Sequence, residues 1–178
     1  MSALNNKWLI VLPNVKLTPT IEPVIIALDK YFEAAKLKAN VTSGLRDAND
    51  QLRVIRGYLT KKGLDKKYPL AMTCKVTDET TPGIYDWQMA WSNLLNIGVI
   101  INPPIAAKCL MDYKNKKGQI INQTPHARGT AFNIGGGGNG ISDEIAVINK
   151  ALADKIPGLI SVLAERENNA AHCDCKKI

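Results

Sequence analysis

The sequence predicts an α+β fold in which helices pack against a small, mainly antiparallel sheet. Apolar residues recur with a helical period after residue 18 and again after residue 142. Short β-prone segments lie near the start of the chain, after residue 130 and at the end, where a short turn separates the last two. The 178 residues suffice for one core, and no repeat or linker interrupts them. We therefore expect a single domain over residues 1–178.

Composition and charge limit the classes of partner. Hydrophobic residues make up 46% and charged residues 22%, as in soluble globular proteins. No apolar run approaches the roughly 20 residues that span a bilayer, and the run at 8–12 is too short for a signal peptide. We therefore expect no signal peptide and no membrane partner. The net charge of +7 favours anionic partners, but the lysines are scattered, so they are expected to be solvated and nucleic acid is not a favoured partner.

The four cysteines are too sparse for a disulfide scaffold in a chain of this length. Cys173 and Cys175 follow His172 in a β-prone segment and could form one corner of a metal site. Their spacing is not that of a zinc knuckle, so half-buried strand thiols are favoured.

The first part of the chain predicts a strand, a helix, a strand and a second helix. The strand covers residues 8–12. In the first helix, Thr18 is the expected N-cap and Pro19 the first helical residue. The residues expected on its buried face are Ile21, Val24, Ile25, Leu28, Phe32 and Ala35. Residues 39–45 are β-prone, and Asp47 should cap the second helix, whose expected inward residues are Leu52, Ile55 and Leu59.

The remaining segments are assigned by the same signals. We expect a loop over residues 58–75, a third helix from Thr80 to Gly98, and an extended run over 99–104. Strands follow at 106–113, 119–122 and 130–134, and residues 135–138 form a glycine loop. Ser142 should cap a fourth helix with an acidic first turn. The last strands are expected at 159–165 and 170–175, with a turn at 167–169.

The segment from Thr124 to Asn133 carries the first candidate site. His126, on a loop or strand start, and Asn133 are too far apart for one helical face, but their tips can converge if the chain turns at Gly129. The segment resembles the Ser-x-His-x-x-Gly-x-Ala-x-Asp motif of the D-alanyl-D-alanine carboxypeptidase and L-alanyl-D-glutamate endopeptidase family of zinc peptidases. Bacteriophage endolysins and the hedgehog-type fold are related to this family. His126, Gly129 and Ala131 are in register, while Thr124 replaces the serine and Asn133 the zinc-binding aspartate.

A second segment is also similar to the family. Ser43, Gly44 and Arg46, followed by Gln51 in a helix, resemble the family's Ser-Gly-Tyr-Arg-Ser segment and its glutamine. The resemblance implies substrate binding by Ser43, Arg46 and Gln51. Arg46 would lie over the metal and bind a substrate carboxylate or the oxyanion of the intermediate. A structural alternative is that Arg46 pairs with Asp47 or Asp50 at the start of the helix.

The resemblance implies His126, Asn133 and His172 as metal ligands. It places Asn169 at the general-base position, three residues before His172. A catalytic zinc needs three protein ligands and a carboxylate near the bound water, and amides replace both acidic residues here. We therefore expect a site that has kept its shape and lost its reaction, without bound zinc. Glu165 or Glu167 could act as the base if the last hairpin contains a bulge.

These expectations lead to a catalytically inactive zinc-peptidase-like domain with the hedgehog and DD-peptidase type of fold. It would act as a structural or binding module in a bacteriophage particle, after synthesis in the host cytoplasm. Its partners would be other virion proteins or cell-wall peptidoglycan. The alternative is an active zinc peptidase that cuts peptidoglycan stem peptides, with His126, Asn133 and His172 as ligands. A third hypothesis, a nucleic-acid-associated protein, rests on charge alone.

Overall fold

The computed structural model describes residues 4, 6–61, 63, 70–71, 100–101, 125–135 and 141–178. The chain divides into two compact units. The first combines Met1–Leu45 with Arg128–Ile178, and the second is Arg46–Ala127. The single domain over residues 1–178 stays a prediction, because one domain can contain two such units.

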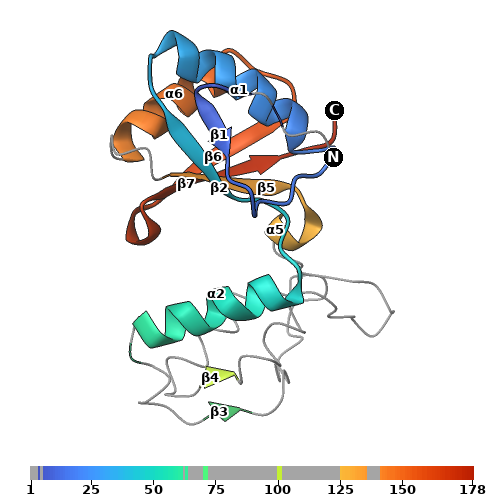
Figure 1. Ribbon diagram of the computed structural model, residues 1–178, viewed down its shortest axis with the longest axis vertical. Coiled ribbons are helices and arrows are strands. Elements are labelled where there is room, and N and C mark those ends of the chain that lie inside the picture. The colour runs from blue at the N-terminus through green and yellow to red at the C-terminus, as the bar shows by residue number, and fades with distance from the viewer. Residues whose placement is uncertain are drawn as a thin grey trace, which may run out of the picture. The chain divides into compact units, whose positions relative to one another are not determined.

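The first unit contains a five-stranded mixed sheet (Figure 1). Its strands, in sheet order, are β1 (Leu9–Val11), β2 (Ala39–Ser43), β5 (Ala131–Gly135), β7 (Ala170–Cys175) and β6 (Leu159–Glu165). β1 and β2 are parallel, and the other three pairings are antiparallel. This arrangement confirms the predicted α+β class. The strands at 159–165 and 170–175 have the predicted bounds.

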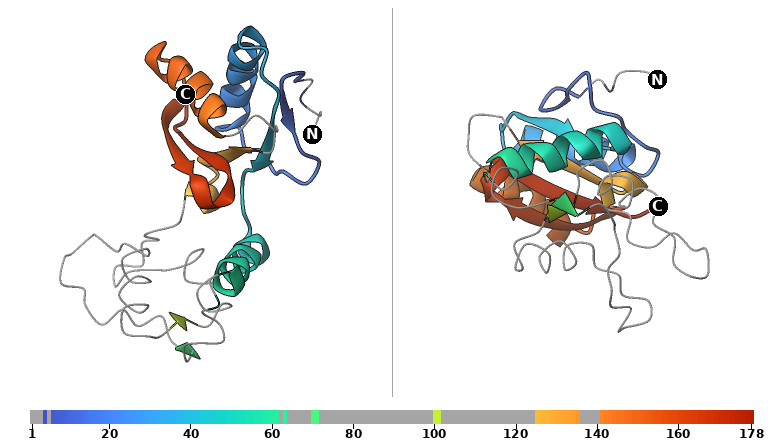
Figure 2. Two further views of the ribbon diagram at one scale, coloured as in Figure 1. Left: turned by 90° about the vertical axis from the view of Figure 1, so that its left-hand side faces the viewer. Right: turned by 90° about the horizontal axis from the view of Figure 1, so that it is seen from below.

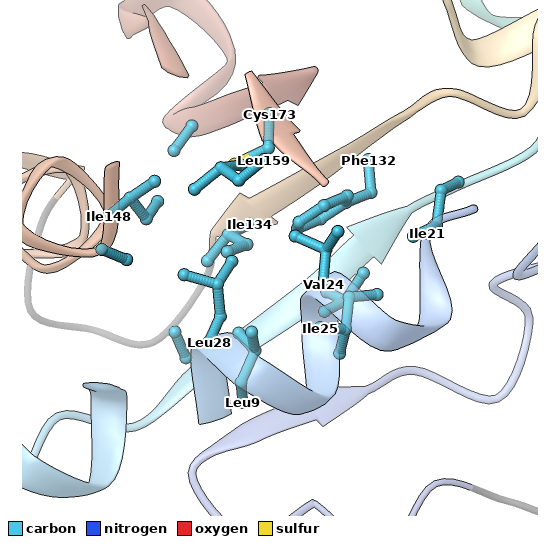
Figure 3. Packing of buried hydrophobic residues seen from close by; sticks show 14 of the residues in the cluster. Leu9, Ile21, Val24, Ile25, Leu28, Phe132, Ile134, Ile148, Leu159 and Cys173 are labelled. Atoms are coloured by element: carbon cyan, nitrogen blue, oxygen red, sulfur yellow. The ribbon is translucent and has the colours of Figure 1, made fainter. Parts of the chain in front are cut away.

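Helices α1 (Glu22–Ala34) and α6 (Ile141–Ala153) pack on one face of this sheet (Figure 2). The core between them draws on both helices and on alternate strand residues (Figure 3). Its largest apolar side chains with almost no exposed surface are Phe32, Phe132, Leu9, Ile21, Ile25, Leu28, Ile134 and Ile148. Burial of such side chains stabilises a fold by about 1.5–3 kcal/mol each, so this layer holds the first unit together.

The start of α1 differs from the prediction. The helix begins at Glu22 with Pro23 in its first turn, not at Pro19. The Thr18 hydroxyl accepts a hydrogen bond from the Ile21 N–H (3.3 Å) and donates one to the Gly129 carbonyl (2.7 Å). Thr18 therefore holds the turn before the helix and joins it to residues far along the chain. The predicted buried face is confirmed except at Ala35, which is exposed.

One carboxylate fixes the beginning of β1 against α1. The Asp29 side chain accepts hydrogen bonds from the backbone N–H groups of Trp8 (2.9 Å) and Leu9 (2.6 Å). A carboxylate that accepts backbone N–H groups forms charge-assisted bonds, which are stronger than neutral ones. The edge strand is thereby tied to the helix that covers it.

The second unit contains α2 (Ala48–Lys61) and a short parallel pair, β3 (Leu70–Ala71) and β4 (Ile100–Ile101). Asp47 caps α2 as predicted, because its Oδ1 accepts from the N–H groups of Asn49 (3.0 Å) and Asp50 (2.9 Å). The loop predicted over residues 58–75 is wrong at 58–61, which are helical, and at 70–71, which form β3. The predicted inward side chains of α2 lie outside the described residues, as do the predicted helix 80–98 and strands 106–113 and 119–122.

Two smaller corrections concern the segment before β6. Gly135 belongs to β5, although a glycine loop was predicted to start there. Helix α6 begins at Ile141, so Ser142 lies inside it and is not its cap, while the acidic first turn is confirmed. None of the helices in the described parts of the chain is long and apolar enough to cross a membrane.

Candidate functional site

The sheet face opposite the helices carries the predicted site residues of the first unit. Along β5 and β7, polar residues alternate with core residues because successive side chains point to opposite faces. Ser43 pairs with Asn133, and Asn133 pairs with His172. Directly opposed residues in a sheet lie on the same face. Three neighbouring strands therefore place Ser43, Asn133 and His172 in one row, and Leu163 of β6 follows opposite His172.

The amide of Asn133 joins two of its neighbours. Its Nδ2 donates a hydrogen bond to Oε2 of Glu165 (3.2 Å), and its Oδ1 lies 3.0 Å from Nδ1 of His172. A carboxylate at Glu165 only accepts, so it fixes which end of the amide faces which partner. Asn133 is 6% exposed, so both ends of its amide are used inside the protein.

The second nitrogen of His172 faces a carboxylate. Nε2 lies 3.2 Å from Oδ1 of Asp174, whose Oδ2 accepts from the Ser161 hydroxyl (2.8 Å). The partners of both ring nitrogens, the Asn133 amide oxygen and the Asp174 carboxylate, are acceptors. Because Ser161 donates to Asp174 and not to His172, the three side chains lack the order of a serine nucleophile with its histidine base.

Glu165 belongs to this network. Its Oε1 lies 3.7 Å from Nδ1 of His172, and its Oε2 also accepts from Asn168 (3.3 Å). The hairpin is regular at this end, since the register irregularity lies between Leu159 and Ser161. No bulge is therefore needed for Glu165 to reach the site. Leu163 pairs with His172, so Glu165, two residues further along β6, lies on the same face of the sheet. This two-residue spacing in the hairpin is the sequence signal that identifies Glu165.

Asn169, the predicted base position, is exposed and has a left-handed backbone with φ 48°. It follows the single 3₁₀ turn η1 (Arg166–Asn168) and opens β7. Asparagine tolerates this conformation better than most residues, so the turn itself accounts for the asparagine. The Asn169 carbonyl lies so close to Gly135 that a Cβ on Gly135 would meet it at 2.6 Å. Glu167 lies in η1, and its side chain is outside the described residues.

Arg46, Gln51 and His126 belong to the second unit, while Gly129 belongs to the first. His126 is 4% exposed and lies on the short helix α5 (Pro125–Arg128), which corrects the predicted loop or strand start. The Arg46 N–H donates to the His126 carbonyl (3.2 Å), so the two motif segments meet through their backbones. The predicted turn at Gly129 is confirmed, with φ 68°. Gln51 lies in α2, and its side chain is outside the described residues.

The network does not fit a resident zinc ion. Within the described ranges, no group of three or more histidine, cysteine, aspartate or glutamate side chains could hold a metal ion. Glu165 and Asp174 lie at different nitrogens of His172, so the two carboxylates do not converge on one point. Asn133 offers a neutral amide oxygen, a weaker ligand than a carboxylate, and that oxygen already faces His172.

In comparisons with known proteins, no family model, curated protein or solved structure matches the chain. The resemblance to zinc peptidases therefore rests on the motif residues in the sequence.

Proposed function

We propose that this chain is a degenerate zinc-peptidase-like domain that has lost the metal chemistry and acts as a binding or structural module. The observation that carries the proposal is the hydrogen bond between Asn133 and His172, the two residues that the resemblance assigns as ligands. A histidine binds a metal through an unprotonated nitrogen. Here each ring nitrogen of His172 faces a protein acceptor instead.

Zinc binding would have to reverse several of these contacts. His172 would lose its contact with Asn133 or with Asp174, and the neutral amide of Asn133 would bring no charge to the metal. The network is part-buried, since the side chains of Glu165 and Asp174 are 30% and 35% exposed. Connected hydrogen bonds of this kind favour one arrangement of the side chains. The retained residues therefore support a structural role for this face of the sheet.

The proposed setting is a bacteriophage particle, and the proposed partners are other virion proteins or cell-wall peptidoglycan. The support for this setting is the resemblance to wall-directed peptidases, together with the net charge of +7, which favours anionic wall polymers. A domain of this kind would bind the wall without cutting it. The hedgehog and DD-peptidase type of fold is part of the same proposal.

A second candidate function is favoured by one observation. The Glu165 carboxylate lies beside both Asn133 and His172, where an active zinc peptidase could use it as the general base in place of Asn169. In this alternative, His126, Asn133 and His172 would hold zinc. The metal would supply an activated water, and Glu165 would take its proton.

One assay separates the two candidates. The unmodified chain is incubated with purified peptidoglycan and zinc, and both the bound protein and the newly released amino groups are measured. We expect binding to the wall without release of stem peptides. Release that disappears in Glu165→Gln and in His126→Ala, but persists in the control Glu33→Gln on an exposed position of α1, would establish the second candidate and overturn the first.

A further inference from the structure

Helix α2 gathers basic side chains that are scattered in the sequence. Positions 49, 53, 56 and 60 follow a spacing of four, three and four residues, which places them on one helical face. Positions 57 and 61 adjoin this face, and all six residues are exposed. The residues of this basic face are Asn49, Arg53, Arg56, Gly57, Thr60 and Lys61.

The basic face carries more positive than negative charge. Arg53, Arg56 and Lys61 are cationic, and Asp50 is the acidic residue on the same side of the helix, because its position falls between those of Gly57 and Lys61. Asp50 lies 3.9 Å from the Arg53 guanidinium, whose side chain is 75% exposed. An exposed pair at this distance contributes little stability, so Asp50 leaves Arg53 able to reach a partner.

Gly57 lies in the interior of the continuous helix α2. Glycine in the interior of a helix costs about 1 kcal/mol relative to alanine. Among the described residues, a Cβ added at Gly57 would meet nothing within 4 Å, and its φ is not in the left-handed region. Neither the backbone conformation nor packing against the described residues therefore requires glycine here. A glycine in the middle of an exposed cationic face lets another molecule's backbone approach the helix closely.

We propose that the basic face of α2 binds the phosphate backbone of a nucleic-acid duplex. The positive charge of the face complements the negative charge of a phosphate backbone, and the geometry of the helix adds to this match. Arginine guanidinium groups bind phosphate oxygens in a forked, bidentate way, and short side chains such as Asn49 and Thr60 commonly donate to phosphates. A capped helix of 14 residues is about 21 Å long and holds these groups at fixed spacings, as a duplex holds its phosphates.

A flexible wall polymer also carries phosphates, but it does not require donors held at fixed positions. The duplex is therefore the partner that the rigid face favours. This inference is independent of the proposed function, because it concerns the second unit and none of the residues in the Asn133 and His172 network.

The test uses the full chain and a fluorescent 20-base-pair DNA duplex, with binding followed by anisotropy between 50 and 200 mM salt. We expect Arg53→Gln/Arg56→Gln to weaken binding on the order of tenfold at low salt and to reduce the salt slope by about 2, one for each lost phosphate contact. The matched control Lys30→Gln/Lys150→Gln removes equal charge from exposed positions of α1 and α6 and should change binding much less.

Gly57→Ala provides a second variant that keeps all charges. It should raise the melting temperature, because alanine is the better helix former, and weaken duplex binding by obstructing close approach. Three results would overturn the inference. They are no duplex binding by the unmodified chain at 50 mM salt, equal losses in the arginine and lysine variants, or stronger competition by purified wall teichoic acid than by unlabelled duplex at equal phosphate concentration.

Discussion

Asn133 determines the chemistry of the site because an amide has one donor end and one acceptor end. Its donor end faces Glu165 and its acceptor end faces His172. A carboxylate at this position would offer only acceptors, and it would repel Glu165. An amide at this position therefore suits a protein that holds these side chains together without a cation.

The first prediction concerns a carboxylate in place of the Asn133 amide. Asn133→Asp removes the donor to Glu165 and buries a second carboxylate beside it. Without metal, we expect a loss of about 1–3 kcal/mol in the free energy of unfolding. Added zinc should restore stability, since a ligand that binds only the folded state stabilises it. Thermal unfolding with and without zinc measures both effects.

Asn168→Asp is the matched control for this variant. Asn168 also donates to Oε2 of Glu165, but it is exposed, so its change should cost at most about 0.5 kcal/mol and show no response to zinc. Equal stability of Asn133→Asp and the unmodified chain, with no zinc response, would contradict the role given to the amide.

The sequence predicted some of the site and missed Asp174 and Ser161, which belong to the same network. Asn133 and His172 were assigned to one site, and they are cross-strand partners. Glu165 was considered only with a bulge, although the regular hairpin already brings it to the site. Asn169 has a left-handed backbone in the turn before β7, and its assignment to the position of the base stays a prediction. The place of Glu165 depends on the register of the hairpin, which the spacing of residues from a motif does not reveal.

At the scale of elements, strand β7 places polar side chains on one face of the sheet and cysteine thiols on the other. His172 and Asp174 face the polar network, while Cys173 and Cys175 face the core and are free thiols. Cys173 and His172 point to opposite faces of the sheet, as the burial pattern of β7 shows. The thiols are buried more deeply than the predicted half-buried state.

Burial raises the pKa of the Cys173 thiol well above its usual value, and the neighbouring Cys175 and Asp174 add to this rise. Burial first, and then Asp174, raises the pKa of Cys175 to about 12. The thiols of the folded protein therefore stay neutral at pH values where those of the unfolded chain ionise. The stability that they contribute is fully present below pH 9.0, the usual thiol value, and is lost as the pH rises towards about 12.

Two measurements check this prediction. In a Cys74→Ser/Cys109→Ser variant, which keeps only these two cysteines, thiol reagents at pH 8 should label the native protein far more slowly than the denatured protein. Denaturant unfolding should show stability that declines above pH 9, and Cys175→Ala should reduce the decline. Rapid native labelling would show that the β7 thiols are not held in the core.

The sequence best predicted the elements in which the hydrophobic pattern ends at a recognisable turn or cap residue. The last two strands are bounded by clear turn residues, so their limits were predictable. Helix α1 has two prolines near its start, and the hydrogen bonds from the Ile21 and Glu22 N–H groups to the Thr18 carbonyl place the first proline in a turn before the helix. Helix α5 is one turn long, too short for periodicity to identify.

At the scale of the whole molecule, the chain is two compact units, with the second inserted between the parts of the first. The first unit has its own core and its own polar network. Composition and periodicity predicted the α+β class, but they could not show this division, because it depends on contacts between residues far apart in sequence. The net charge of +7 likewise did not reveal the basic face of α2, which only the helical geometry brings together.

The central claim is that the site has kept its arrangement and lost its metal chemistry. The most direct test is the zinc content of the unmodified full chain, purified without chelators, dialysed against excess zinc and then against buffer, and measured by elemental analysis. The network around Asn133 and His172 predicts far less than one zinc per chain. About one zinc per chain, retained after dialysis and lost in His172→Ala, would contradict the account and favour the peptidase in which Glu165 is the base.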